Sequence, residues 1–451
     1  MNNKKVLIIG LDCATPQIMF GELLEELPTI GNLAKNGIAA RLRSSSPPIT
    51  IPAWMVMATG KDPGQLGNYG FRYRKPEDYQ TFHIANSHHI REKKIWDSLQ
   101  EYNKKSILVG IPPSYPPYEV YGCLVGCFIT PDRESEFTYP PQLKSEIFSV
   151  APEWQFDVPF RTEERDSLLE NLYSMTEDHF KVIEFLVREK EWNFFHFVEI
   201  GMDRVHHAFW KYFDPEHHLY QPNHKYGDVI KDYYKFIDKK IGRIVDMVKD
   251  NTTIFLVSDH GAKRMKGCFC INEWLIEKGY LVLKKYPEEI IPFEKLEVDW
   301  EKTYAWGWGG YYGRIFINKK GREREGIVRE KDYERFREKL KQEIENIRGP
   351  ADEEWKTIVH KPEKFYNRVE GYPPDLIVYF DDLYWRSAGT IGRRRLYLDE
   401  NDTGPDDAVH DWEGVFIKYE KSNPLKNTPI GVKQYNISDI PSMVLQEFGE
   451  I

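Results

Sequence analysis

The chain has 451 residues, of which 41% are apolar and 14% are aromatic. This is enough for a large folded core, and the length predicts either one large α/β domain with insertions or two domains. The 62 basic and 71 acidic side chains are interspersed and give a net charge of −9, so the sequence has no basic surface typical of nucleic-acid binding.

Cysteines and apolar segments indicate the cellular compartment. Five cysteines in a chain of this length do not make a disulfide framework, and we expect buried free thiols in a reducing compartment. The apolar run at residues 6–11 is shorter than the core of a signal peptide, and no cleavage site follows it. No apolar run is long enough to span a membrane. These features predict a cytoplasmic protein.

Strands and helices alternate through the first 260 residues. We predict strands at residues 6–11, 39–43, 106–110, 193–199 and 253–257, and helices at residues 16–27, 28–36, 95–102, 167–189 and 229–248. Such alternation is typical of a mostly parallel sheet with helices on both faces. Beyond residue 270 the pattern loosens, with a charged helix at 331–347 and a short strand at 376–380. We therefore predict an α/β core from residues 1–270 and 401–451, and a smaller inserted region, residues 271–400, over the sheet edge.

A serine- and proline-rich segment leads into a helix near position 50. Pro47 and Pro48 keep the approach extended, and we expect Thr50 to cap a helix that begins at Ile51 with Pro52 in its first turn. A hydroxyl in this place faces free backbone N–H groups and the positive end of the helix dipole, where phosphate binds well. Thr50 is therefore a candidate nucleophile. Helix capping alone is the simpler alternative.

Carboxylate and imidazole groups occur where predicted strands end. The candidates are Asp12, Asp203 and Asp259 after strands, with His260 next to Asp259, His207 one helical turn after Asp203, and His410 in a later loop. The carboxyl ends of parallel strands form the edge where open α/β sheets carry their sites. Carboxylate and imidazole ligands suit Zn²⁺, Mn²⁺ or Fe, and they also suit a two-metal site for phosphoryl transfer. Each residue alone has an ordinary structural explanation, and their joint occurrence favours chemistry.

In their order along the chain, these motifs resemble the type I phosphodiesterase/nucleotide pyrophosphatase family of the alkaline phosphatase superfamily. The matching segments are residues 9–14, 47–54, 58–63, 203–207, 258–261 and the late His-x-x-x-Gly at 410–414. Together they span nearly the whole chain. The resemblance implies an α/β fold of the alkaline-phosphatase type, a three-layer α/β/α sandwich with a mostly parallel central sheet and an inserted smaller region.

The resemblance also implies a site with two divalent metal ions, zinc first and manganese as the alternative. Asp12, Thr50, Asp259 and His260 would surround one ion, and Asp203, His207 and His410 would hold the other. Thr50 would attack phosphorus to form a covalent phospho-threonine, which water then hydrolyses. The implied function is a metal-dependent hydrolase of small phosphodiesters or related phosphate esters.

The chain departs from the family pattern near the expected substrate. Leu66 and Gly67 replace a His-Gly pair, and Phe71 stands where nucleotide-cleaving members carry an asparagine. The resemblance therefore supports the metal site and leaves nucleotide specificity open. A phosphomonoesterase, a phosphonate hydrolase and a non-catalytic binding protein with the same fold are the alternatives. A sulfatase or a cofactor-independent phosphoglycerate mutase fits poorly, because the sulfatase arginine and the mutase serine nucleophile are missing.

Two other segments are candidates for substrate contacts. Residues 304–312 are aromatic and glycine-rich, which suits either base stacking or a packed loop. Residues 393–395 are three arginines, which suit either a phosphorylated leaving group or a solvated charge run. The sequence identifies neither the substrate-binding residues nor the oligomeric state.

Overall fold

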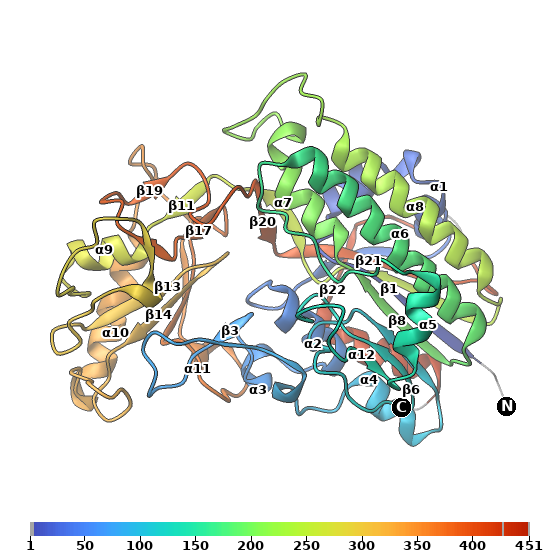
Figure 1. Cartoon of the computed structure of the whole chain (residues 1–451), viewed down its shortest axis with the longest axis horizontal. Helices are drawn as coiled ribbons and strands as arrows, with labels where there is room; N and C mark the ends of the chain where they lie inside the picture. The colour runs from blue at the N-terminus through green and yellow to red at the C-terminus, as the bar shows by residue number, and fades with distance from the viewer. Residues whose placement is uncertain (1–3, 426–427, 450–451) are drawn as a thin grey trace.

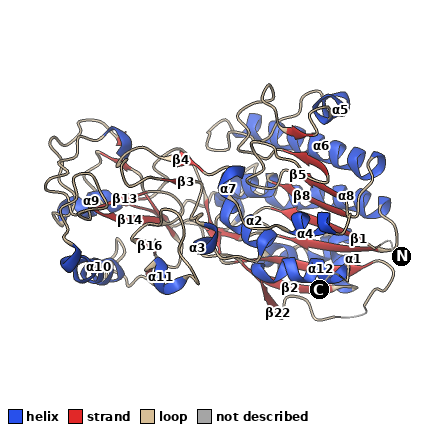
Figure 2. Ribbon diagram, turned by 90° about the horizontal axis from the view of Figure 1, so that it is seen from below, coloured by secondary structure: helices blue, strands red, loops and turns tan. Residues whose placement is uncertain are grey.

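The computed structural model describes residues 4–425 and 428–449. The chain forms a larger lobe around a long sheet and a smaller lobe that contains α9, α10, β13 and β14 (Figure 1). The helices of the larger lobe lie on both sides of its sheet, which Figure 2 shows from below.

The sheet of the larger lobe has nine strands in the order β22-β2-β21-β9-β1-β8-β5-β6-β7. Their bounds are β22 Lys433–Asn436, β2 Ile38–Arg43, β21 Glu413–Glu420, β9 Thr252–Val257, β1 Lys5–Leu11, β8 Phe194–Glu199, β5 Ser106–Val109, β6 Gly122–Val125 and β7 Thr138–Tyr139. Five of the eight neighbouring pairs are parallel, and the antiparallel ones involve β21 or the edge strand β7. The prediction of a mostly parallel central sheet is confirmed.

The central strand β1 shows why the fold has three layers. Successive side chains of a strand point to opposite faces of its sheet. Leu7, Ile9 and Leu11 pack into one hydrophobic cluster, and Val6 and Ile8 pack into another. The first cluster includes residues of α1 Pro28–Lys35, α5 Leu143–Val150, α6 Arg165–Glu189, α7 Gly201–Phe213 and α8 Val229–Met247. The second includes residues of α2 Thr50–Thr59, α3 Pro63–Leu66, α4 Ile95–Glu101 and α12 Ile440–Glu447.

The smaller lobe has its own sheet and core. Four strands, β13 Ala305–Trp308, β14 Gly313–Ile317, β16 Leu376–Tyr379 and β15 Ile358–His360, are all antiparallel. The helices of this lobe are α9 Ile271–Glu277, α10 Glu330–Glu345 and α11 Pro362–Phe365, and further short strands are β11 Gly267–Phe269, β17 Trp385–Ser387, β19 Tyr397–Leu398, β12 Ile291–Pro292 and β18 Thr390–Ile391.

An earlier segment also enters the core of the smaller lobe. Tyr79 stacks on Trp300 with ring centroids 3.8 Å apart. It lies between β3 Arg72–Tyr73 and β4 His83–Ile84, which form a hairpin. The limits of the inserted region, residues 271–400, remain a prediction, and this early hairpin segment lies outside them.

One predicted helical segment differs from expectation. Residues 16–27 were predicted as one helix, but they form a π-helical turn at Gln17–Glu22 and a 3-10 turn at Leu24–Glu26. Phe20, Leu23, Leu24 and Leu27 have the spacing of one helix, which is why the sequence predicted it. Instead, the Leu23 N–H donates to the Ile18 carbonyl, five residues back, at 2.9 Å, and this π-type bond ends the first turn.

A short antiparallel pair completes the edge that carries the candidate site. β10 Gly261–Arg264 pairs with β20 Ala408–Asp411, and Ala262 lies opposite His410. This pairing brings the late histidine, His410, next to residues 259 and 260, which follow β9.

None of the helices in the described ranges has both the length and the apolar character needed to cross a membrane. All five cysteines are free thiols.

Candidate metal centre

Thr50 is the first residue of α2 and not its cap, which corrects the sequence-based expectation. Ile49 takes the extended cap conformation, and its carbonyl accepts the first helical hydrogen bond from Ala53 at 2.9 Å. The helix therefore begins one residue earlier than predicted. The Thr50 hydroxyl lies 3.4 Å from Nε2 of His260, so capping does not account for its position.

Asp12, Asp259 and His260 form one group of buried side chains. Asp12 follows β1, and Asp259 and His260 follow the adjacent parallel strand β9. Nε2 of His260 lies 3.2 Å from Oδ2 of Asp259 and 3.7 Å from Oδ1 of Asp12. These three residues can offer one ligand atom each to a single cation.

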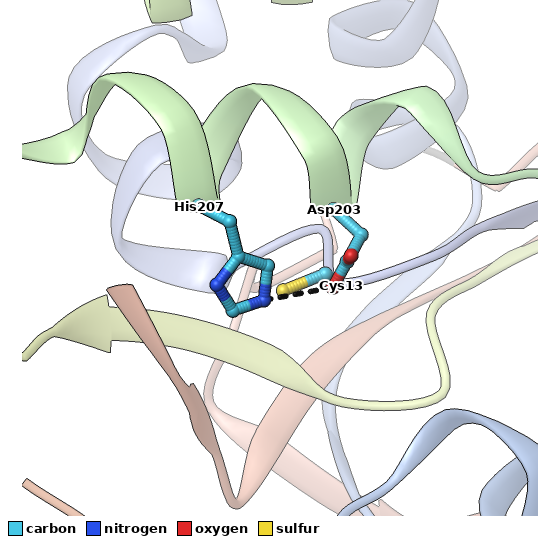
Figure 3. A group of neighbouring side chains, drawn as sticks. All are labelled: Cys13, Asp203 and His207. Carbon is cyan, nitrogen blue, oxygen red and sulfur yellow. Dashed lines mark ion pairs between the residues drawn. The ribbon is translucent and has the colours of Figure 1, made fainter. Parts of the chain in front are cut away.

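The second group has Asp203 at its centre, with His207 and His410 near its carboxylate. Ligand atoms of Asp203 and His410 also lie within 4.8 Å of one of His260, so His260 belongs to both groups. Asp203 and His207 lie one turn apart on α7 and point the same way (Figure 3). Oδ1 of Asp203 is 3.2 Å from Nε2 of His207 and 3.6 Å from Nε2 of His410. The ring of His410 stacks on that of His260 with centroids 3.8 Å apart, so the two groups adjoin. The structure thus brings together all seven residues that the sequence singled out.

Each histidine is held through its other ring nitrogen. Nδ1 of His207 lies 2.7 Å from Oδ1 of Asp406, Nδ1 of His260 lies 3.1 Å from the Gly261 carbonyl, and Nδ1 of His410 lies 2.8 Å from the Pro48 carbonyl. An oxygen acceptor at Nδ1 places the proton there and leaves the Nε2 lone pair free for a metal. The Nε2 atoms of all three histidines are then unprotonated. They lie close to the aspartate carboxylates, where each can bind a metal ion.

Four buried acceptor atoms in the centre have no hydrogen-bond partner within residues 4–425 and 428–449. They are Oδ1 of Asp12, Oδ1 of Asp203, Nε2 of His207 and Oδ2 of Asp259. Each buried unsatisfied polar atom costs about 1–3 kcal/mol, so four in one place need an explanation. Oxygen and imidazole acceptors that converge without donors fit divalent cations such as Zn²⁺ or Mn²⁺.

The pKa shifts show the same excess of negative charge. Burial and then the neighbouring Asp203 raise the pKa of Asp12 well above its usual range. Burial and then Asp12 do the same to the pKa of Asp259. Burial also acts to raise the pKa of Asp203, but His207 and Arg204 hold it well below its usual range. Bound cations would remove the repulsion among these carboxylates.

Sequence reasoning missed Cys13, which we had expected only to be a buried thiol. Its Sγ joins ligand atoms of Asp203 and His207 in a third group, in which all three atoms lie within 4.8 Å of one another (Figure 3). Its φ of 67° is in the left-handed region. The backbone N–H of Cys13 also donates to Oδ1 of Asp259 at 3.2 Å. The available signal was its position directly after Asp12.

Two supporting residues were also missed. Nε1 of Trp54 donates to Oδ2 of Asp12 at 2.8 Å. Trp54 stands in the Thr50 motif, where its regular helical spacing offered a signal. Asp406, which holds His207, stands in no motif that we identified.

The remaining candidate segments divide between core and site. In residues 304–312, Trp306 is fully buried in the core of the smaller lobe, whereas Tyr311 stacks on His410 at 4.1 Å. This segment was predicted either to stack on a substrate or to form a packed loop. Trp306 packs in the core, whereas Tyr311 lies at the candidate site. In residues 393–395, Arg393 donates to Oγ1 of Thr390 at 2.6 Å and Arg394 lies over Tyr286 at 3.9 Å, away from the carboxylate groups.

Comparison with known proteins agrees with this architecture. The structure of phosphonoacetate hydrolase from Sinorhizobium meliloti with phosphonoacetate has a TM-score of 0.62 at 13% identity, covering 98% of this chain and 95% of that one. Human ectonucleotide pyrophosphatase/phosphodiesterase 5 has a TM-score of 0.56 at 14% identity, covering 99% and 95%. The inactive threonine-to-alanine variant of the murine protein with AMP has a TM-score of 0.55 at 13% identity, with the same coverage. No sequence match was found among curated proteins.

The fold and its carboxylate-rich sheet edge thus define an alkaline-phosphatase-like α/β protein, as predicted. A family model of type I phosphodiesterase/nucleotide pyrophosphatase matches residues 6–406. The chain belongs to this family of hydrolases, whose members are typically metal-dependent.

Proposed function

We propose that the protein hydrolyses small phosphodiesters, or related phosphate esters, with Thr50 as the nucleophile and two divalent metal ions as cofactors. The observation that carries the proposal is the position of the Thr50 hydroxyl, 3.4 Å from Nε2 of His260, beside four buried acceptor atoms without partners. One ion would be held by Asp12, Asp259, His260 and Thr50, and the other by Asp203, His207 and His410. Zinc is the expected metal and manganese the alternative.

The chain's own residues set up the reaction. Thr50 presents its hydroxyl at the first turn of α2, where free backbone N–H groups and the helix dipole favour a phosphoryl group. Its attack on phosphorus forms a phospho-threonine ester and releases the alcohol, and water then cleaves that ester. Bound divalent ions would lower the pKa of the hydroxyl and offset negative charge on the phosphoryl oxygens. Trp54 and Asp406 orient Asp12 and His207 for this task.

The named relatives support this chemistry. The murine relative with a threonine-to-alanine change is described as inactive and as bound to AMP. The bacterial relative is a phosphonoacetate hydrolase. AMP contains a phosphoryl group and phosphonoacetate, the ligand of the bacterial relative, contains a phosphonyl group. This is the group that we place at Thr50.

The test is the hydrolysis of bis-p-nitrophenyl phosphate and p-nitrophenyl phosphate with Zn²⁺, with Mn²⁺ and after chelation. We expect metal-dependent turnover that favours the diester and is abolished in Thr50→Ala. Thr59→Ala is the matched control, because Thr59 lies at the other end of the same helix, where its hydroxyl donates to the Met55 carbonyl at 2.7 Å and accepts from the Lys61 N–H at 3.1 Å. Retained turnover in Thr50→Ala would refute the nucleophile, and preference for the monoester would make the protein a phosphatase.

A further inference from the structure

A cavity of about 420 Å³ adjoins the candidate metal centre. Its wall includes Ile49, which precedes Thr50, and Arg204, which follows Asp203. Tyr311 also lines it and stacks on His410 at 4.1 Å. A substrate with its phosphoryl group at Thr50 would therefore extend into this cavity.

The cavity is rich in arginine. Arg72, Arg161, Arg204, Arg314 and Arg386 line it, against two acidic residues, Glu294 and Asp402. The carboxylate of Asp402 already accepts hydrogen bonds from the backbone of Gly389 and Thr390, at 2.8 and 2.9 Å. The lining thus has a clear excess of positive charge.

Three of these arginines are paired with carboxylates. Arg161 and Arg386 both pair with Asp406. Arg204 pairs with Asp157 and Asp203. Within the described ranges, Arg72 and Arg314 have no carboxylate within 4 Å, which sets them apart from the rest of the lining.

Arg314 is a buried cation without a counter-ion. It is 8% exposed, and its Nη1 donates to the Arg72 carbonyl at 2.7 Å. Its Nε has no partner among the residues that the structure describes. Its guanidinium lies 5.2 Å from the ring centroid of Trp308 and 5.6 Å from that of Tyr312. A buried charge of this kind is costly unless an anion neutralises it.

Arg72 shares this space. Its guanidinium lies over the ring of Phe82 at 4.1 Å, and no described residue accepts a hydrogen bond from it. Partial loss of hydration in the cavity lowers its pKa, as do the positive charges of Arg314 and Arg161, whereas the negative charge of Glu294 acts to raise it. The two unpaired guanidinium groups, Arg72 and Arg314, therefore repel each other, and an anion bound between them would relieve that repulsion.

We propose that Arg72 and Arg314 form a subsite for a second acidic group of the substrate, a phosphate or a carboxylate on a substituent of the reacting phosphoryl group. This inference rests on the proposed function, because it assumes that the phosphoryl group binds at Thr50. Guanidinium groups bind both anions through paired N–H donors. The preferred substrates are thus phosphodiesters or phosphoanhydrides that carry a second negative group.

The test uses three esters with the same p-nitrophenolate leaving group. The other substituent of the phosphodiester is ethyl, 2-carboxyethyl or 2-phosphonooxyethyl. Binding is measured by calorimetry on the metal-loaded Thr50→Ala variant, and turnover is measured on the wild-type enzyme. A charge-assisted hydrogen bond predicts that at least one acidic substituent improves Kd by about tenfold or more over ethyl. Comparison of the two acidic esters identifies which anion the subsite prefers.

Arg314→Gln and Arg72→Gln, each added to Thr50→Ala, should reduce that preference to near unity. Arg72 is exposed, so its variant keeps the test valid if Arg314→Gln fails to fold. Arg324→Gln is the matched control, because Arg324 lies outside the cavity with a side chain 73% exposed, and it should keep the preference. Equal Kd values for all three esters would overturn the subsite, as would a preference that survives both cavity variants. Absence of turnover on all three esters would instead refute the proposed function.

Discussion

Trp54 offers a sharp test of how the centre holds metal. The indole is fully buried, and its Nε1 donates to Oδ2 of Asp12 at 2.8 Å. Trp54→Phe removes this donor and leaves a second oxygen of Asp12 without a partner. A hydrogen bond to a charged group contributes about 1.5–3 kcal/mol. Since one factor of ten corresponds to about 1.4 kcal/mol, we expect metal affinity at the Asp12 group to fall about ten- to a hundredfold.

The assay is a competition titration of Zn²⁺ against a chromogenic chelator. Trp210→Phe is the matched control: Trp210 is also buried, and its Nε1 donates to Oδ2 of Asp214 at 3.0 Å, outside the seven candidate residues. Trp210→Phe loses the same ring volume as Trp54→Phe and also loses one indole hydrogen bond. This control variant should bind metal with the affinity of the wild type. Equal zinc affinity in Trp54→Phe and the wild type would refute the idea that Trp54 orients a ligand.

Three further predictions follow from the same centre. Asp406→Asn removes the carboxylate 2.7 Å from Nδ1 of His207 and leaves the Ala408 carbonyl at 3.1 Å, so the metal content after dialysis should fall to about one ion per chain, while two retained ions would contradict the role of Asp406 in holding His207. In the chelated protein, the pKa of Asp12 and of Asp259 is raised, so their contribution to stability is present below pH 3.8 and is lost as pH rises through the raised values. The increase in Tm on adding Zn²⁺ should therefore be larger at pH 8 than at pH 5, and an equal or smaller increase would contradict this account of the charge. Cys13→Gly removes the thiol and keeps the backbone, because glycine adopts the left-handed conformation of this position, φ 67°, without strain. If Cys13 is a ligand, the Co²⁺-loaded variant should lack a thiolate-to-cobalt absorption band that the wild type shows, and its absence in both would exclude the thiol.

The sequence predicted the parallel core well, because its strands are short apolar runs buried on both faces. β1 and β9 alternate side chains between two clusters, so both faces had to be apolar. The aspartates at the ends of these strands were therefore found from chain position alone. The spacing of Asp203 and His207 also placed them on one face of α7.

Other features depend on contacts between distant segments, which no local pattern encodes. The start of α2 moved by one residue because the Ile49 carbonyl, and not a threonine side chain, begins the helical hydrogen bonds. The Pro48 carbonyl holds His410 across 362 positions of sequence. Arg72 and Arg314 meet because a hairpin from the first hundred residues packs against the smaller lobe. The arginine run at residues 393–395, which was prominent in the sequence, lies outside the cavity lining.

In the proposed mechanism, Thr50 becomes covalently esterified during turnover. The most direct measurement is rapid acid quench of the metal-loaded enzyme with bis-p-nitrophenyl phosphate, followed by peptide mass spectrometry. We expect a nitrophenyl phosphoryl ester on Thr50 that forms within the first turnover and disappears as substrate is exhausted. Steady turnover with an unmodified Thr50 at every quench time, together with activity in Thr50→Ala, would contradict it.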